Sequence, residues 1–262
     1  MTHTHDHPNG SLRGPLATGG APKPRLLITA GPTQEPVDAV RFLGNRSSGR
    51  LGVDLAAAAA RRGWSVRLLL GRGASVSPDV LDQDRVSIER FGSTIDLAQL
   101  LDRHFPSTDV LVMAAAVADY RPVIEDGDLE TKLRRVADRL VIECEPTPAL
   151  LAGLGARKRD DQLLVGFALE PEAQLAASGR SKLERKNADL LVATPLETMD
   201  SPDIRATLIA REGLGLAACR RLEKTSKDAF ADRLLDVAAE ARRALLVSTA
   251  DEIAATDTQV KS

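Results

Sequence analysis

Short apolar runs alternate along the chain with longer segments in which apolar residues recur at helical spacing. Unbroken apolar runs predict buried strands over residues 26–30, 66–70, 110–116 and 163–170, with a shorter strand at 86–91. Alanine-rich or amphipathic segments between them predict helices over residues 51–60, 94–105 and 172–186. Strands that alternate with helices in this way are typical of a doubly wound parallel sheet, whose ligands bind at the carboxyl ends of the strands.

A change of pattern after residue 124 predicts a small arm beside this sheet. A polar loop is followed by a strand-like run at 140–144, which favours a β-hairpin with its turn near Ala137 and Asp138. The predicted fold class is therefore α/β: a three-layer, Rossmann-like, doubly wound, mostly parallel sheet with a small β-hairpin arm.

The two ends of the chain differ from this central part. Residues 1–24 are polar, lack the apolar core of a signal peptide and are predicted to be a disordered leader. Near the other end, residues 205–210 and 214–220 resemble a hairpin, and a closing amphipathic helix is expected to end at about Leu246. These boundaries predict one domain over residues 25–246 and a flexible tail over 247–262.

The most distinctive stretch joins the first predicted strand to the first predicted helix: GPTQEPVDAVRFLGNRSSGRLG, residues 31–52. A helix start carries partial positive charge and unpaired N–H groups, so small residues there let an anionic ligand approach the backbone. Ser47, Ser48 and Gly49 suit that role. The alternative is that Ser47 or Ser48 only caps the helix, which leaves Asn45 and Arg46 in the same turn unexplained. The tight G-x-G-x-x-G fingerprint of dehydrogenases is absent.

Charge and cysteine content narrow the function classes. The formal net charge is -2 over 262 residues, which implies no general attraction to nucleic acid or to an anionic membrane. Neither Cys144 nor Cys219 belongs to a C-x-x-C pair, so a disulfide or structural zinc is unsupported. No apolar segment approaches the roughly 20 residues that span a bilayer. We therefore expect a cytoplasmic protein that binds neither nucleic acid nor membranes.

Residues 29–52, TAGPTQEPVDAVRFLGNRSSGRLG, resemble the signature of phosphopantothenate-cysteine ligases, and several further motifs follow over roughly residues 25–240. The resemblance implies a ligase of coenzyme A biosynthesis that joins 4'-phosphopantothenate to L-cysteine through an acyl-nucleotidyl intermediate, with release of pyrophosphate. It implies Mg²⁺, CTP or ATP as co-substrate, and a homodimer. Many bacterial members carry a flavin-dependent decarboxylase ahead of this domain, so a separate decarboxylase is a candidate partner.

Asp119 follows the predicted strand at 110–116, at the edge where ligands are expected. Taken alone, an Asp after a strand is more often a turn former. The resemblance implies that Ala115, Ala116 and Asp119 lie at the substrate site and that this segment can serve the neighbouring subunit.

The basic run Lys132-Leu133-Arg134-Arg135 is, by itself, typical of a solvated strand. The ligase family that the chain resembles carries a basic motif at this position. Lys132 matches the first lysine of that motif, which implies that it neutralises charge near the α-phosphate. Arg134 and Arg135 keep the charge of that motif but change the side chain.

Phe167 ends a buried strand and could belong to the core, whereas the family's Gly-Phe-x-x-Glu motif implies that it packs against the nucleotide base. Lys182 and Lys186 lie one helical turn apart and match lysines that meet the triphosphate. Ala149 stands where the family usually has Asp, and Thr194 where it commonly has Asn. Thr147 and Pro148 suit the cap and first position of a helix.

The resulting site assignments fall into three groups. The catalytic residues are expected to be Asn45 and Lys132. The nucleotide-binding residues are expected to be Gly31, Ser47, Ser48, Gly49, Gly52, Asp119, Lys132, Pro148, Phe167, Lys182 and Lys186. The substrate-binding residues are expected to be Asn45, Arg46, Ala115, Ala116 and Asp119. No set of side chains is predicted to bind a metal directly.

Two other functions fit parts of the sequence. An NAD(P)-dependent oxidoreductase would use a similar sheet, but the glycine fingerprint and the ribose-binding acid are missing. A non-catalytic nucleotide-binding relative would keep the fold without the chemistry; the retained Asn45, Asp119 and Lys132 weigh against it, whereas Ala149 and Thr194 leave it open.

Overall fold

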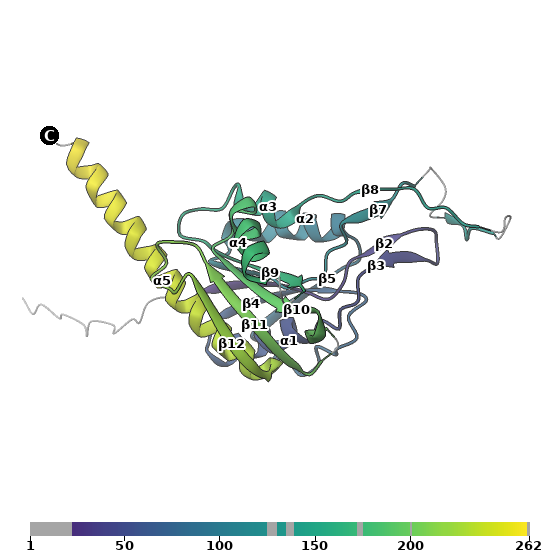
Figure 1. Cartoon of the computed structure of the whole chain (residues 1–262), viewed down its shortest axis with the longest axis horizontal. Coiled ribbons are helices and arrows are strands. Elements are labelled where there is room, and N and C mark those ends of the chain that lie inside the picture. Colours follow the sequence, from purple (N-terminus) through teal and green to yellow (C-terminus); the bar gives the residue numbers. More distant parts are fainter. Residues whose placement is uncertain (1–22, 125–129, 135–138, 172–174, 200, 261–262) are drawn as a thin grey trace, which may run out of the picture.

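The computed structural model describes residues 23–124, 130–134, 139–171, 175–199 and 201–260. Within these residues, eight strands form one sheet in the order β12-β11-β10-β9-β6-β1-β4-β5 (Figure 1). They are β1 (Arg25–Ala30), β4 (Ser65–Gly71), β5 (Val86–Phe91), β6 (Val110–Met113), β9 (Leu163–Glu170), β10 (Leu190–Pro195), β11 (Asp203–Ala210) and β12 (Cys219–Ser226). The first six run parallel, and β11 and β12 add an antiparallel edge. The predicted α/β class with a mostly parallel sheet is confirmed.

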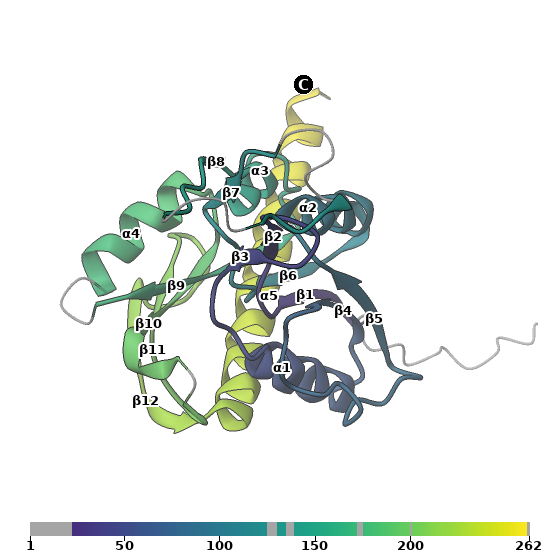
Figure 2. The same ribbon diagram turned by 90° about the vertical axis from the view of Figure 1, so that its right-hand side faces the viewer.

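Helices cover both faces of this sheet, which gives the predicted three layers (Figure 2). The helices are α1 (Arg50–Arg61), α2 (Thr94–His104), α3 (Leu150–Gly155), α4 (Leu175–Arg185) and α5 (Lys227–Val260), with short 3-10 turns η1 (Phe105–Ser107) and η4 (Leu196–Thr198). Successive strand residues point to opposite faces. On β1, Leu26 and Ile28 accordingly join the core beneath α1 and α5, whereas Leu27 joins the core beneath α2, α3 and α4.

The strand predicted over residues 110–116 is shorter than expected. β6 ends at Met113, because the next residues leave the sheet and bond to the loop after β1. The Ala116 amide donates to the Gly31 carbonyl at 2.9 Å, and the Thr33 amide donates to the Ala116 carbonyl at 3.2 Å. The alanines therefore line the edge of the sheet where β1 also ends.

Two small strand pairs stand beyond the same edge (Figure 1): β2 (Gln34–Pro36) with β3 (Phe42–Gly44), and β7 (Tyr120–Pro122) with β8 (Cys144–Pro146). The second pair belongs to the predicted arm, but the strand expected at 140–144 is misplaced. Leu140 and Val141 are 60% and 78% exposed, so their apolar pattern reflects a surface and not a buried strand. The turn predicted near residues 137 and 138 lies outside the described residues.

Two predictions near the end of the chain are also wrong. The last strand is not at 214–220, because Gly213 and Gly215 have positive φ and place the buried Leu214 in the turn. The closing helix does not end near Leu246 but continues to Val260 and projects from the body (Figure 1). Residues 246–248 are exposed, yet residues 246–260 contain no Gly or Pro that would end a helix. Among the described residues, no helix is long and apolar enough to cross a membrane.

Candidate functional site

The turn that leads into α1 presents backbone, not a side-chain cap. Gly49 occupies the N-cap position with a φ of 78°, a left-handed conformation that suits glycine. Neither Ser47 nor Ser48 is the N-cap residue, because the left-handed backbone puts glycine at that position. Ser48 Oγ nevertheless accepts a 3.3 Å bond from the amide of Arg50, the first residue of α1. A helix start of this kind leaves further first-turn N–H groups for an anionic ligand.

A cleft of about 680 Å³ opens in front of this turn, at the carboxyl ends of the parallel strands. It brings together residues from the α1 turn, the end of β6, the end of β9 and α4. The predicted site residues that line it are Asn45, Arg46, Ser47, Ser48, Gly49, Gly52, Ala115, Ala116, Asp119, Phe167, Lys182 and Lys186. Segments more than 130 residues apart in the sequence therefore meet at one place, as the sheet topology requires.

Asn45 is held against the opposite wall of the cleft. Its Nδ2 donates to the Val117 carbonyl at 3.0 Å, which joins the α1 turn to the segment after β6. Two buried hydroxyls support that segment from below: Thr29 Oγ1 accepts from the Ala115 amide at 3.1 Å, and Thr33 Oγ1 accepts from the Ala118 amide at 2.9 Å. The Asn45 side chain is thus bonded to a backbone segment that two buried hydroxyls hold in place.

The cleft is lined by many more cations than anions. Its charged residues are Arg46, Arg50, Lys182, Lys186, Lys227 and one acid, Asp119. Lys182 forms an ion pair with the buried Glu170. Burial, reinforced by the charges of Lys182 and Arg185, lowers the pKa of Lys186 from its ordinary 10.5, and Asp119 opposes the shift. An anionic ligand would relieve this repulsion, so the electrostatics favour phosphate or carboxylate groups.

A neighbouring hollow of about 550 Å³ shares Asp119, Phe167, Lys182 and Lys186 with the cleft and is bounded by Pro148. Phe167 is partly buried on β9 at the boundary of the two spaces. Placing Thr147 and Pro148 at the start of a helix was wrong: α3 begins at Leu150 with Ala149 as its N-cap. The reason is that Thr147 Oγ1 donates instead to the Ala118 carbonyl at 2.5 Å.

Two predicted site residues do not line either space. Gly31 is buried behind the α1 turn, where a Cβ would lie 3.0 Å from Ala74 Cβ. Lys132 lies on the arm and is exposed. The cleft of one chain therefore forms without Lys132.

The structure adds lining residues that the sequence patterns did not single out, among them Leu169, Thr198, Met199, Ile204 and Lys227. Lys227 had a usable signal, since it is the first residue of α5, where the helix dipole disfavours a cation. Leu169 lies on β9, and the others come from the end of η4 and from β11, whose proximity to the α1 turn depends on the sheet order. Thr194, the departure from the family pattern, also lines the cleft and is buried.

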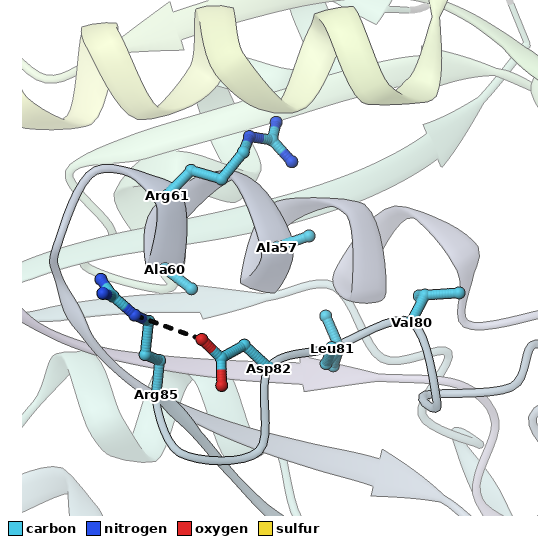
Figure 3. Close-up of a pocket in the computed structure, with 7 residues that line it drawn as sticks. All are labelled: Ala57, Ala60, Arg61, Val80, Leu81, Asp82 and Arg85. Carbon is cyan, nitrogen blue, oxygen red and sulfur yellow. Dashed lines mark ion pairs between the residues drawn. The ribbon is translucent and has the colours of Figure 1, made fainter.

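A separate hollow of about 450 Å³ lies beside the far end of α1 (Figure 3). Its charged groups are already paired: Arg85 Nε lies 3.2 Å from Asp82 Oδ2, and Arg61 pairs with Asp232 on α5 at 3.3 Å. The remaining lining residues, Ala57, Ala60, Val80 and Leu81, are apolar. This hollow shares no residue with the cleft and presents no unpaired group for chemistry in the described chain.

Among the described residues, no group of three or more His, Cys, Asp or Glu side chains could hold a metal ion. Asp119 is the one carboxylate among the residues that line the cleft. A divalent cation at this site would therefore need most of its oxygen ligands from a bound ligand such as a triphosphate.

Comparison with known proteins identifies the family of the chain. Residues 22–241 match the model of the DNA/pantothenate metabolism flavoprotein C-terminal domain. The chain belongs to this family. A crystal structure of the C-terminal domain of the coenzyme A biosynthesis bifunctional protein CoaBC is 30% identical, with a TM-score of 0.66, and the match covers 86% of this chain and 96% of that one. The fold is thus a family feature.

Longer relatives in the family match over part of their length. The bifunctional protein CoaBC of Mycobacterium tuberculosis (strain H37Rv) is 37% identical over 81% of this chain and 51% of its own length. A cysteine/cysteine sulfinic acid decarboxylase from an unknown prokaryotic organism is 39% identical over 66% of this chain and 46% of its own length. The chain therefore spans about half the length of these curated relatives.

Proposed function

We propose that the chain is a phosphopantothenate-cysteine ligase, which joins 4'-phosphopantothenate to L-cysteine in coenzyme A biosynthesis. One observation carries the proposal: a single cation-rich cleft unites Asn45, the α1 turn and Phe167 at the carboxyl edge of the sheet. Membership of the family and the similarity to the CoaBC C-terminal domain support it.

The reaction has two steps. A carboxylate oxygen of 4'-phosphopantothenate attacks the α-phosphorus of CTP or ATP, the α–β bridging bond breaks, and pyrophosphate leaves. The cysteine amine then attacks the acyl carbon of the mixed anhydride, loses a proton and displaces the nucleoside monophosphate. Both steps involve highly charged groups and no enzyme nucleophile. Catalysis therefore depends on positioning and on charge neutralisation.

The lining residues can supply both contributions. The Asn45 amide would hold the pantothenate carboxylate and then the anhydride, with its orientation set by the bond to the Val117 carbonyl. The Ser47–Gly49 backbone would contact phosphate oxygens at the helix start. Lys182 and Lys186 would contact the triphosphate, and Phe167 would pack against the base. In the bound state, Lys182 would exchange its pair with Glu170 for a phosphate oxygen.

Mg²⁺ would reach the site together with the nucleotide. Asp119 is the one carboxylate among the residues that line the cleft, so phosphate oxygens of the nucleotide would supply most of the oxygen ligands of the metal. Bound there, Mg²⁺ would neutralise part of the triphosphate charge. We propose CTP as the nucleotide, with ATP as the alternative.

We further propose a homodimer formed through the arm and the β2–β3 loop. These two segments lie at the same end of the molecule (Figure 1), and both expose large apolar side chains. They are Val40, Phe42, Leu43, Tyr120, Val123, Leu140 and Val141. Contiguous exposed apolar residues of this kind mark interaction surfaces. The exposed Lys132 would then complete the cleft of the partner subunit.

Pyrophosphate release tests the proposal directly. The protein is mixed with 4'-phosphopantothenate, Mg²⁺ and either CTP or ATP, with and without L-cysteine. Turnover that continues only with cysteine supports the ligase, and the faster nucleotide identifies the co-substrate. Absence of release with both nucleotides would instead support a non-catalytic nucleotide-binding relative.

Variants test the residue roles in the same assay. Asn45→Ala and Lys132→Ala are each expected to lower kcat at least about a hundredfold, since each removes a group that contacts developing charge. Lys224→Ala is the matched control, because Lys224 is 69% exposed on β12 and does not line the cleft. Wild-type rates for both test variants would refute the assigned roles.

We also propose a flavin-dependent decarboxylase as a functional partner, since one relative is a bifunctional coenzyme A biosynthesis protein and another is a decarboxylase. It would consume the ligase product. Co-purification of such an enzyme with the chain at a fixed stoichiometry would support a stable complex, whereas independent elution would argue against one.

A further inference from the structure

A buried carboxylate lies in the loop between β2 and β3. Asp38 is 3% exposed, although residues 39–44, which follow it, are exposed. Its Oδ1 accepts the amides of Val40 and Arg41, both at 2.8 Å. Its Oδ2 accepts Arg41 Nε at 2.9 Å and forms an ion pair with the same guanidinium. Asp38 thus holds the loop in one conformation.

The same carboxylate reaches across to the arm. Asp38 Oδ2 accepts the Leu133 amide at 3.0 Å, and Arg41 Nη2 donates to the Leu133 carbonyl, also at 3.0 Å. The Ala39 amide donates to the Thr131 carbonyl at 3.2 Å. We call these three bonds the loop–arm clamp. They join residues more than 90 positions apart in the sequence.

The clamp brackets Lys132. It binds the backbone of both neighbours, Thr131 and Leu133, and none of its three bonds uses the Lys132 side chain. The backbone at residue 132 is therefore fixed while its ammonium stays on the surface. On the other side, β3 leads directly from Arg41 to Asn45, whose amide bonds to the Val117 carbonyl. One short segment therefore connects the anchor of Lys132 to Asn45.

Charge keeps the clamp intact. The guanidinium of Arg41 and the three backbone amides hold the pKa of Asp38 well below its ordinary value of 3.8. Burying a carboxylate costs free energy unless its oxygens accept hydrogen bonds, and both oxygens of Asp38 do so. Asp38 thus remains ionised at neutral pH, where the ligase would work.

We infer that Asp38 is a positioning residue, which sets Lys132 in its working position through the backbone of Leu133. The inference rests on the proposed ligase function and on the assignment of Lys132 to charge neutralisation. Asp38 lines neither the cleft nor the adjoining hollow, so it acts through the arm and not on the reactants.

The kinetic test is a double-mutant cycle between Asp38→Asn and Lys132→Ala in the pyrophosphate assay. Asp38→Asn keeps the size of the side chain but weakens its bonds to the Leu133 amide and to Arg41. In the wild-type background it is expected to lower kcat at least about tenfold, with the nucleotide KM changed less than about twofold. In the Lys132→Ala background it is expected to change kcat less than about twofold, because the group that it positions is gone.

Glu35→Gln is the matched control. Glu35 is also buried and in the same region of the chain, but it accepts the Thr94 amide at 2.8 Å and the Thr94 hydroxyl at 2.6 Å, away from the arm. Any loss of kcat in this variant is expected to be the same with or without Lys132. Equal losses for Asp38→Asn in both backgrounds, or a wild-type kcat for Asp38→Asn alone, would overturn the inference.

A second measurement needs no activity. Hydrogen exchange of the Leu133 amide, followed by NMR, is expected to be slow in the wild type and in Glu35→Gln, and at least about tenfold faster in Asp38→Asn. Amides of β1 should remain protected in all three proteins, which shows that the fold is intact. An unprotected Leu133 amide in the wild type would refute the clamp even in an active ligase. Lack of turnover with a protected amide would refute the proposed function and leave the clamp standing.

Discussion

Gly52→Ala is expected to destabilise the protein although alanine is the better helix former. A Cβ at position 52 would lie 2.2 Å from Ala30 Cβ, where carbon atoms normally pack at about 3.5–4.0 Å, so α1 must move away from β1 by about 1.5 Å. Overpacking of this kind costs about 1–3 kcal/mol, and the gain in helix propensity returns up to about 1 kcal/mol. The expected net loss is about 1–2 kcal/mol.

Thermal unfolding followed by circular dichroism measures this loss. For a domain of this size the change corresponds to a Tm lower by about 2–8 °C. Gly153→Ala is the control, because Gly153 lies within α3 and a Cβ there would meet no atom within 4 Å. It is expected to raise Tm by up to about 4 °C.

The same displacement should affect function. Moving the start of α1 shifts the backbone of the Ser47–Gly49 turn, so the nucleotide KM of Gly52→Ala is expected to rise while that of Gly153→Ala stays unchanged. If Gly52→Ala raised Tm as much as Gly153→Ala does, the packing argument would be refuted. If Gly52→Ala were destabilised but kept the wild-type nucleotide KM, the packing of α1 against β1 would not affect phosphate binding at the turn.

Two further substitutions test the electrostatics. Lys186→Met is expected to raise the nucleotide KM about tenfold or more, since it removes a charged contact to phosphate. Because the pKa of Lys186 is lowered, this side chain loses its proton at a lower pH than an ordinary lysine does. The nucleotide KM of the wild type should therefore rise with pH in the alkaline range. In Lys186→Met the part of this rise that is due to Lys186 should be absent. Lys224→Ala should keep the wild-type pH profile. Asp189→Asn removes the charge of a fully buried carboxylate that pairs with Lys158 and with the partly exposed Arg211, and should cost about 3 kcal/mol in urea unfolding; a loss below about 1 kcal/mol would contradict that pairing.

Local patterns were sufficient where burial and periodicity agree. β5 and β9 have the predicted boundaries, and the α1 turn lies where the glycine-punctuated loop indicated. The carboxyl-edge rule predicts that Asp119 and the turn before α1, which contains Asn45, lie at one edge, because parallel strands bring their ends together. The cleft lining agrees with that expectation.

Local patterns failed where a tertiary contact competes with an intrinsic preference. Thr147 has the chemistry of a helix cap but bonds to the Ala118 carbonyl, so α3 starts later. Ser48 has the same chemistry, yet the left-handed Gly49 takes the N-cap position. The apolar residues at 140 and 141 look like a strand but lie on the surface.

The sequence by itself determined the α/β class, the position of the turn that leads into α1 and half of the residues that line the cleft, since these depend on periodicity and on short motifs. Only the tertiary structure decided that Lys132 lies outside the cleft of its own chain and that Asp38 binds the backbone beside it. That bond joins residues 95 positions apart, and its partner is a backbone amide. A backbone N–H leaves no trace in residue identity, so no pattern along the chain could have revealed the contact.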